Sequence, residues 1–210
     1  IAIINLLMNS NQFRHRLPKS YYLNIDVVHL AKDLLGKVIY TNINHKITSG
    51  IIIETEAYKS INDKASHAYL NKRTARNENM YQEGGIAYVY LCYGIHCLLN
   101  IVTNKENIAD AVLIRAIEPK DGIEIMESRI SHNSIKTIKL GPGKLSKALG
   151  VDMSFNGKSL TLNEIWIEDQ IESCFFEIEQ KQRIGIEYAE EDKKLPWRFY
   201  IKNNKFVSVQ

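Results

Sequence analysis

The sequence predicts an α+β fold: a single mixed domain around a curved, mainly antiparallel β-sheet with a protruding β-hairpin. Strand-like segments follow one another with few helices between them, and many of the connections have the length of a hairpin turn. Strands and helices do not alternate regularly, which argues against a parallel α/β sheet. The chain has 210 residues, of which 45% are hydrophobic, and this suffices for one large core.

Three short helices are expected. In the segment 26–37, Asp26 is suited to cap a helix and Gly36 to end it. Apolar residues recur there at helical spacing and form one face (Val27, Leu30, Ala31, Leu34 and Leu35). The segment 121–130 forms the second helix, and a Gly-Pro loop leads into the third within 140–151.

The expected strands are rich in β-branched and aromatic residues (37–42, 45–58, two within 86–103, and 111–119). The polar residues Asn42–Asn44 provide a turn between the first two strands. Tyr93 and Gly94 interrupt the segment 86–103, and glycine at that point favours a tight hairpin turn.

Two glutamates lie near the end of the strand 45–58. Strict alternation places Ile52, Glu54, Glu56 and Tyr58 on one face, and Ile51, Ile53, Thr55 and Ala57 on the other. A long polar loop follows, and functional sites are commonly built where such loops begin. Two interpretations stay open here: a solvated pair of glutamates that contacts lysines, or a catalytic pair of carboxylates.

Tyrosines crowd the hairpin expected at 86–103 (Tyr88, Tyr90 and Tyr93), and Tyr81 precedes it. Tyr93, beside the glycine of the turn, would be exposed at the tip, where an aromatic side chain can enter between base pairs. Tyr90 lies further down the strand, where it could stack on an extruded base. Ordinary packing within the sheet is the alternative for these tyrosines.

The net charge of +3 conceals an uneven distribution. Residues 164–192 carry ten acidic residues and two basic ones, whereas three other segments contain bases and no acids (67–77, 135–147 and 193–210). Such segregation is typical of a face that binds a polyanion, although an ordinary solvated distribution explains the charges equally well. If DNA is the polyanion, Arg73, Arg76 and Lys144 are the expected contacts.

Several other classes of protein find little support. Three cysteines without a CxxC pair (Cys92, Cys97 and Cys174) argue for free thiols in a reducing compartment. The six histidines lack the spacing of zinc enzymes, and GPGKLS lacks that of a nucleotide-hydrolysing loop, although its backbone and Lys144 suit a DNA phosphate. The apolar stretch 1–9 is too short to span a bilayer and no basic segment precedes it, so we expect an intracellular protein without a membrane span.

The chain contains, in this order, LAKDLLGKVI, GIIIETEAY, ASHAY, RTARNENMY, AYVYLCYGIHCLLNIV, AVLIRAIEP, GPGKLSKALGV, RIGIEYAEE and LPWRFYIKNNKFVSV. Together these stretches resemble the alkyladenine (3-methyladenine) DNA glycosylase family. We therefore expect a glycosylase domain over residues 26–210 and an N-terminal segment, 1–25, outside the resemblance. The departures are small: Ala75 stands where the family often has proline, and Ser146 and Lys147 replace the commoner cysteine and glutamine.

The resemblance carries roles onto particular residues. Glu56 matches the general base, and Arg115 and the backbone carbonyl of Ile184 match groups that help to hold the attacking water. The walls of the base pocket fall on Tyr58, His67 and Tyr90. Asn100 matches the residue that discourages guanine through its 2-amino group, and Tyr93 matches the wedge that fills the gap left in the duplex.

The function implied by the resemblance is that of a monofunctional DNA glycosylase, a hydrolase that flips an alkylated or deaminated purine out of duplex DNA and leaves an abasic site. The sequence is compatible with 3-methyladenine, 7-methylguanine, hypoxanthine and ethenoadenine. No metal or cofactor is implied, and we expect a monomer that binds damaged double-stranded DNA. Two alternatives remain: a metal-dependent nuclease that uses Glu54, Glu56 and a histidine, and a non-enzymatic module that detects distorted DNA.

Overall fold

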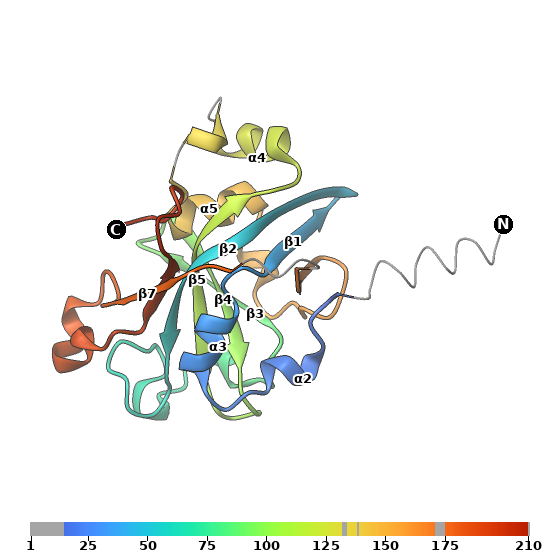
Figure 1. Ribbon diagram of the computed structural model, residues 1–210. Coiled ribbons are helices and arrows are strands. Elements are labelled where there is room, and N and C mark those ends of the chain that lie inside the picture. Colours follow the sequence, from blue (N-terminus) through green and yellow to red (C-terminus); the bar gives the residue numbers. More distant parts are fainter. Residues whose placement is uncertain (1–14, 132–133, 138, 171–174, 210) are drawn as a thin grey trace.

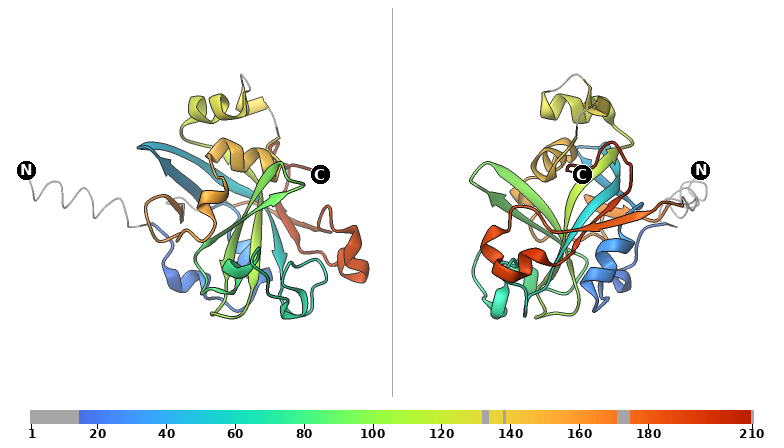
Figure 2. Two further views of the ribbon diagram at one scale, coloured as in Figure 1. Left: turned by 180° about the vertical axis from the view of Figure 1, so that it is seen from behind. Right: turned by 60° about the vertical axis from the view of Figure 1, so that its left-hand side comes forward.

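The computed structural model describes residues 15–131, 134–137, 139–170 and 175–209, and its strands form one eight-stranded sheet (Figure 1). The strands are β1 (Val38–Ile43), β2 (Lys46–Tyr58), β3 (Ala87–Cys92), β4 (His96–Thr103), β5 (Asp110–Pro119), β6 (Ile165–Glu168), β7 (Ile178–Lys181) and β8 (Arg198–Ile201). Their pairings are antiparallel, and the sheet curls strongly (Figure 2). The predicted α+β class is therefore confirmed.

The helices are few and short. They are α2 (Lys19–Tyr22), α3 (Val27–Asp33), α4 (Ile123–Ile130) and α5 (Pro142–Leu149). Short 3₁₀ segments occur in the connections between these elements: η1 (Tyr69–Asn71), η2 (Glu78–Tyr81), η3 (Ile135–Thr137), η4 (Met153–Phe155) and η5 (Glu187–Lys194). Within the described ranges, no helix has the length and apolarity needed to cross a membrane.

Strand β2 organises the sheet, whose main path runs β3-β4-β5-β2-β1-β6. One edge of β2 pairs with β5 along most of its length. The other edge pairs first with β1, over residues 46–51, and then with β8, over residues 54–56. As a result, β5 and β8 flank the end of β2 that carries the two glutamates.

The main core lies on one face of the sheet, under α3 and α5. Alternate side chains of the strands point into it, among them Ala57, Val89, Leu99, Val112 and Ile114. The α3 helix packs on β2 and β5, and α5 packs on β4 and β5 (Figure 2). Because the helices cover this face, a binding site can form on the opposite face of β2, β3, β4 and β5.

The local chemistry predicted for α3 is confirmed. The carboxylate of Asp26 accepts hydrogen bonds from the backbone N–H groups of Val28 and His29, at 3.0 and 3.1 Å. The helix ends at Asp33, and Gly36 follows with φ +84°, a conformation that L side chains rarely adopt. The expected start and end of this helix therefore follow from its own residues.

The two expected hairpins are present, and one turn differs from the prediction. The first turn comprises Asn44 and His45, both at positive φ, rather than Asn42–Asn44, because β1 stays paired as far as Ile43. The second turn lies at Tyr93 and Gly94, with φ of 50° and 72°, as expected. The hairpin formed by β3 and β4 ends in this exposed turn.

The predicted faces of β2 are partly wrong. Ile52 packs into the main core together with Ala57, whereas Ile53 packs with Tyr200 and Phe206 in a separate cluster. The cause is a break in the register with β5 between Ile52 and Thr55, which adds a residue on β2. Strict alternation therefore fails before Glu54 and resumes after it, leaving both glutamates on the face away from α3.

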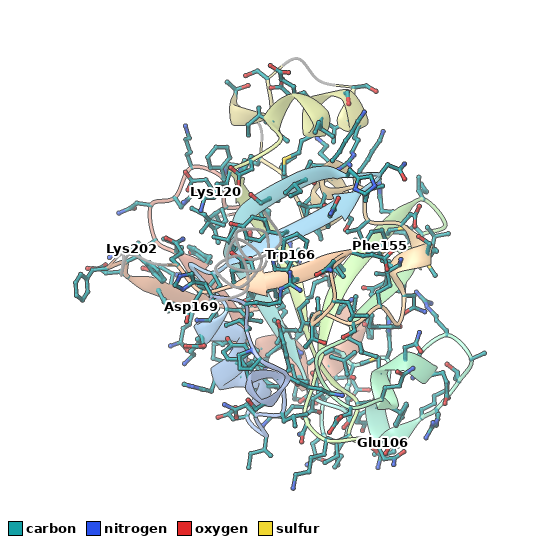
Figure 3. The ribbon with its side chains drawn as sticks, turned by 90° about the vertical axis from the view of Figure 1, so that its right-hand side faces the viewer. Glu106, Lys120, Phe155, Trp166, Asp169 and Lys202 are labelled. Carbon is teal, nitrogen blue, oxygen red and sulfur yellow. The ribbon has the colours of Figure 1, made fainter. Side chains whose placement is uncertain are left out.

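Strand β6 forms one edge of the main path of the sheet, next to β1, and Figure 3 shows Trp166 and Asp169 on this side. The Trp166 ring stacks on Tyr40 with a centroid separation of 5.1 Å, and Arg16 lies over it at 4.7 Å. The N–H of Leu17 donates to the carbonyl of Ile167 at 2.9 Å. Arg16 and Leu17 are thus packed against this edge.

Candidate active site

One row of residues crosses five strands on the face opposite α3. Glu56 pairs with Arg198 of β8 on one side and with Leu113 of β5 on the other. Leu113 pairs with Asn100 of β4, and Asn100 pairs with Tyr88 of β3. Residues directly opposite in antiparallel strands share a face. The row therefore aligns a carboxylate, an amide and a phenol, which come from distant parts of the chain.

A cavity of about 250 Å³ lies over this row, close to the lower end of the volumes typical of small-molecule sites. Its aromatic walls come from β2, β3 and two loops (Tyr58, His67, Tyr88, Tyr90 and Tyr188). The strands β4 and β5 supply Leu98, Asn100, Ala111, Leu113 and Arg115. An aromatic slot with a few polar groups at one end suits a flat, heteroaromatic ligand.

The carboxylate of Glu56 has no exposed surface and receives three donors from residues that line the cavity. The N–H of Ile184 donates to Oε1 at 2.8 Å, and the hydroxyl of Tyr58 donates to Oε2 at 2.7 Å. The guanidinium of Arg115 lies 3.2 Å from Oε1. Burial raises the pKa of Glu56, and these three donors oppose the rise. A buried carboxylate with a raised pKa is suited to accept a proton.

Glu54 is equally buried, which overturns the interpretation of the two glutamates as a solvated pair. Its Oε1 accepts from Arg115 at 2.9 Å and from Arg198 at 3.0 Å. The N–H of Ser208 donates to its Oε2 at 2.7 Å. Glu54 and Glu56 therefore share Arg115 inside a buried group of two acids and two arginines, far from any lysine partner.

His67 and the tyrosines form a hydrogen-bonded aromatic wall. The Nδ1 of His67 and the hydroxyl of Tyr88 share a hydrogen bond of 2.9 Å, and the ring of His67 meets that of Tyr90 edge-on at 4.5 Å. Burial, with Arg76 nearby, lowers the pKa of His67 to about 4. The imidazole is therefore neutral at physiological pH and does not repel a cation in the cavity.

Asn100 is almost fully buried in the floor of the cavity. Its Nδ2 donates to the carbonyl of Tyr88 at 3.2 Å, which fixes the side chain against β3. An amide held in this way presents a rigid polar surface to a bound ring. The role that the resemblance gives Asn100, which is to discourage guanine through its 2-amino group, stays a prediction.

The loop 182–188 closes one side of the cavity, and a buried ion pair fixes it. The guanidinium of Arg183 contacts both carboxylate oxygens of Asp63, at 2.5 and 2.7 Å, and both side chains are fully buried. Arg183 also donates to the carbonyl of Ala57 at 2.8 Å and lies 4.8 Å from the ring centre of Tyr58. The pair thereby ties this loop to the end of β2, next to Glu56.

The tip of the β3–β4 hairpin stands at the rim of the cavity. Tyr93 is 89% exposed and yet lines the cavity, so its ring is available to another molecule. Cys92 pairs with His96 and Leu91 with Cys97, so the two cysteines lie on opposite faces of the hairpin. Both thiols are free, as expected, and Cys174 lies outside the described residues.

Comparison with known proteins decides the family. A family model described as methylpurine-DNA glycosylase matches residues 21–205. The chain belongs to the methylpurine-DNA glycosylase family. A protein of Chlamydia felis named "Putative 3-methyladenine DNA glycosylase" is 50% identical over 195 residues, covering 92% of this chain and all of the relative. A protein of Clostridium perfringens with the same name is 46% identical over 203 residues, covering 92% of this chain and 98% of the relative.

This membership confirms the family and the enzyme class, a DNA glycosylase, that the motifs indicated. A DNA glycosylase of this family binds damaged DNA, so the expectation of a DNA partner is met at that level. The relatives are matched over nearly their whole length. The roles of individual residues are a separate matter and are proposed below.

The three basic residues expected at DNA have different surroundings in this glycosylase. Arg73 is exposed but paired with Glu78, and its guanidinium lies 4.7 Å from the ring centre of Tyr81. Arg76 lies 5.1 Å from the ring centre of Tyr90, at the cavity wall. Lys144 is exposed on the first turn of α5, whose first residue lines the cavity. Arg73 and Arg76 are thus both engaged within the chain, since Arg76 also donates to the carbonyl of Leu91 at 3.2 Å, whereas Lys144 is exposed two residues after a cavity residue.

Sequence reasoning missed several residues of the site. Tyr88 could have been recognised as a pocket residue, because it lies two residues before Tyr90 and alternation gives both the same face. Tyr188 lines the cavity and donates from its hydroxyl to the carbonyl of Ala65 at 3.1 Å, within the stretch RIGIEYAEE, which carries the resemblance without a role for this tyrosine. The ion pair of Asp63 and Arg183 had no local signal, since 120 positions separate its members.

Proposed function

We propose that this glycosylase extrudes an alkylated or deaminated purine from duplex DNA and hydrolyses its N-glycosidic bond with a water activated by Glu56. The observation that carries the proposal is the fully buried carboxylate of Glu56, whose three donors, Tyr58, Arg115 and Ile184, come from residues that line an aromatic cavity. The proposed substrates are 3-methyladenine, 7-methylguanine, hypoxanthine and ethenoadenine.

The carboxylate of Glu56 has two functions in the proposed hydrolysis. Hydrolysis passes through a sugar with oxocarbenium character, which a negative charge nearby stabilises. The incoming water must also lose a proton, and the raised pKa of Glu56 makes it an effective acceptor. Arg115, together with the backbone carbonyl of Ile184, orients this water in the proposal, and no metal or cofactor takes part.

The cavity favours damaged bases for electrostatic reasons. Alkylation at N3 or N7 makes a purine cationic, and a cation over an aromatic face gains about 0.5–2 kcal/mol. Tyr58 and Tyr90 offer such faces, and neutral His67 adds no repelling charge. Damaged pairs also unstack at lower cost, which adds selectivity at the flipping step. Asn100 is proposed to exclude guanine by meeting its 2-amino group.

A base-release assay tests this function. The protein is incubated with duplex oligonucleotides, each carrying one of the four lesions or an undamaged purine, and the free base is quantified. We expect release from at least one lesion, undiminished by excess EDTA. Strand cleavage that EDTA abolishes would support the metal-dependent nuclease, and tight binding without release of any base would support the non-enzymatic module.

The product DNA is expected to keep an intact abasic site until it is treated with alkali. Among the described residues that line the cavity there is no lysine, so no amine is in place to attack the sugar and form a Schiff base. Borohydride added during turnover should therefore trap no covalent protein–DNA adduct. A stable adduct on a denaturing gel would contradict hydrolysis by water.

Binding to damaged duplex DNA should weaken steeply with salt. Each phosphate contact contributes about −0.9 to the slope of log Kobs against log salt. At least one contact from each of the three base-only segments therefore predicts a slope of about −3 or steeper. Lys144→Gln should reduce the steepness by about one contact, whereas Lys46→Gln, outside those segments, should leave it unchanged. A nearly flat dependence in fluorescence anisotropy titrations would show that these segments do not contact DNA.

Tyr93→Ser should impair stable extrusion of the base more than hydrolysis of a base already extruded. The exposed ring at the hairpin tip is proposed to fill the gap in the duplex, which a serine cannot do. The fluorescence of ethenoadenine, which is quenched when the base is stacked, measures extrusion directly. Ile95→Ser is the matched control, because Ile95 is an exposed apolar residue of the same turn. Equal fluorescence in wild type and Tyr93→Ser would remove Tyr93 as the wedge.

A further inference from the structure

The proposed function does not use Glu54, although it is as inaccessible as Glu56. Its two oxygens are occupied by different parts of the chain. Arg115 and Arg198 donate to Oε1, and the backbone N–H of Ser208 donates to Oε2 at 2.7 Å. The donors of Glu56 all come from residues that line the cavity, whereas Arg198 and Ser208 do not line it, so we assign Glu54 an effect on its neighbours rather than on a substrate.

The donor at Ser208 belongs to a segment that is itself held in place. Phe206 and Val207 are buried in a small apolar cluster with Ile53 and Tyr200. The carbonyl of Val209 accepts from Arg198 at 2.8 Å, so this arginine bridges Glu54 and the same segment. The segment 206–209 is therefore anchored by apolar packing, and it presents one N–H, one hydroxyl and one carbonyl to the buried charges.

Arg115 is the link between this segment and the reactive carboxylate. Its Nε contacts Glu54 and its Nη1 contacts Glu56, so one rigid guanidinium serves two competing acids. The N–H of Ser208 donates to the other oxygen of Glu54. This hydrogen bond offsets part of the negative charge of Glu54 and so weakens the attraction between Glu54 and Arg115. Any loss of this N–H shifts Arg115 toward Glu54 and away from Glu56.

We propose that the segment 206–209 is a latch that positions Arg115 through Glu54 and so sets the proton affinity of Glu56. The latch rests on the proposed function only for its effect on the reaction rate, because the proton affinity of Glu56 can be measured without DNA. Glu54, Arg198 and the latch are positioning groups in this proposal, since they act on Glu56 through Arg115.

The groups around Glu56 allow the direction of each change to be derived. Facing it are Arg115 from β5, Tyr58 and Glu54 from β2, and the N–H of Ile184 with Arg183 from the closing loop. Arg198 is its register partner on β8. Withdrawal of Arg115 removes a positive charge and raises the pKa of Glu56. Removal of the negative charge of Glu54 lowers the pKa, and it also frees Arg115 for Glu56.

The test is a carboxyl ¹³C NMR titration of the DNA-free protein labelled at glutamate, in which Glu56→Gln identifies the resonance of Glu56. Ser208→Pro removes the N–H of the latch together with the hydroxyl that lies 3.4 Å from Nη2 of Arg115, and Ser208→Ala, which removes only the hydroxyl, is the matched control. We expect Ser208→Pro to raise the pKa of Glu56 by about one unit, the scale on which a nearby opposite charge acts. Glu54→Gln should lower it by a similar amount, and Ser208→Ala should change it far less than Ser208→Pro.

Opposite shifts in Ser208→Pro and Glu54→Gln support the latch. An unchanged titration in a folded Ser208→Pro variant overturns it, even if the melting temperature falls, because the segment is then only structural. If Ser208→Pro does not fold, Glu54→Gln decides alone, and a pKa that rises or stays constant overturns the proposal. Failure of the wild-type protein to release any base would refute the proposed function and leave this titration to judge the latch.

In active protein, the acidic limb of the rate profile should move with the titration. Single-turnover excision by Ser208→Pro should lose its rate at a higher pH than the wild type, and Glu54→Gln at a lower pH. A latch that only maintained the fold would change the fraction of active enzyme and not the position of this limb. Coincidence of the two pH measurements ties the positioning of Glu56 to the reaction.

Discussion

Replacement of Glu56 by glutamine is expected to lower the single-turnover rate of base excision at least ~10²-fold, the low end for loss of a general base. Glutamine keeps the size of the side chain but carries no negative charge and accepts no proton near neutral pH. The cavity, the aromatic walls and the exposed hairpin remain. Binding of damaged DNA should therefore survive or tighten slightly, since a negative charge near the sugar is removed.

The control for this variant is Glu118→Gln, at the far end of β5. Glu118 accepts a hydrogen bond from Asn204 at 2.8 Å, which the carbonyl of a glutamine can also accept, and it does not line the cavity. Excision by this variant should stay near the wild-type rate. Glu54→Gln is unsuitable as a control because Glu54 is buried between two arginines. Near-normal excision by Glu56→Gln would refute the catalytic assignment.

Stability measurements separate loss of catalysis from loss of fold. Burial raises the pKa of Glu56 above its ordinary value of 4.5 in the folded state. A raised folded pKa contributes stability below that ordinary value, and the contribution is lost as the pH rises through the folded pKa. Above pH 4.5, the wild type should therefore lose stability that Glu56→Gln keeps, and urea unfolding across this range measures the difference.

Asp63→Asn is expected to lower the free energy of unfolding by about 3–5 kcal/mol, the range for breaking a buried ion pair at one partner. Both members of the pair are fully buried, so Arg183 would keep a charge without its counter-ion. Asp63 also accepts from the N–H groups of Lys59 and Ala65 at 3.2 and 3.0 Å, which fixes the loop that leads to His67. Urea denaturation followed by circular dichroism gives the difference.

Asp169→Asn is the matched control for this measurement. Asp169 pairs with Lys37 at 2.9 Å, but the side chain of Asp169 is 60% exposed, and the largely buried Lys37 keeps a second carboxylate, that of Asp33, at 3.5 Å. The expected loss is at most about 1 kcal/mol, as for other partly exposed pairs. Similar losses in the two variants would mean that the pair of Asp63 and Arg183 is not the tie between the closing loop and β2.

The features that the sequence predicted correctly are those that local chemistry decides. Asp26 caps α3 through its own neighbours, and Tyr93 with Gly94 turns the hairpin because the turn needs positive φ at both positions. The alternation of β3 likewise follows from residues that are adjacent in the chain. Each of these depends on a few consecutive residues, so the pattern alone suffices.

The features that the sequence did not predict depend on contacts between distant segments. The break in register at Ile53 comes from the pairing of β2 with β5, and it reverses the faces of the isoleucines before it. The burial of Glu54 depends on Arg198 and Ser208, both of which lie more than a hundred positions further on. Alternation therefore grouped the two glutamates correctly but could not show that arginines, rather than water, surround them.

At Tyr93, the backbone conformation favours one kind of residue for stability, and the proposed wedge function requires another. With φ of 50°, Tyr93 adopts a left-handed backbone that favours glycine and asparagine and costs other residues about 1–2 kcal/mol. Its ring is solvent-exposed and regains little of this by packing. A library selected for thermal tolerance alone should therefore enrich glycine or asparagine at this position, while one selected for repair of alkylated DNA should retain an aromatic residue. The hairpin tip is thus a place where thermostabilising design, guided only by the unbound protein, would discard the residue proposed to hold the duplex open.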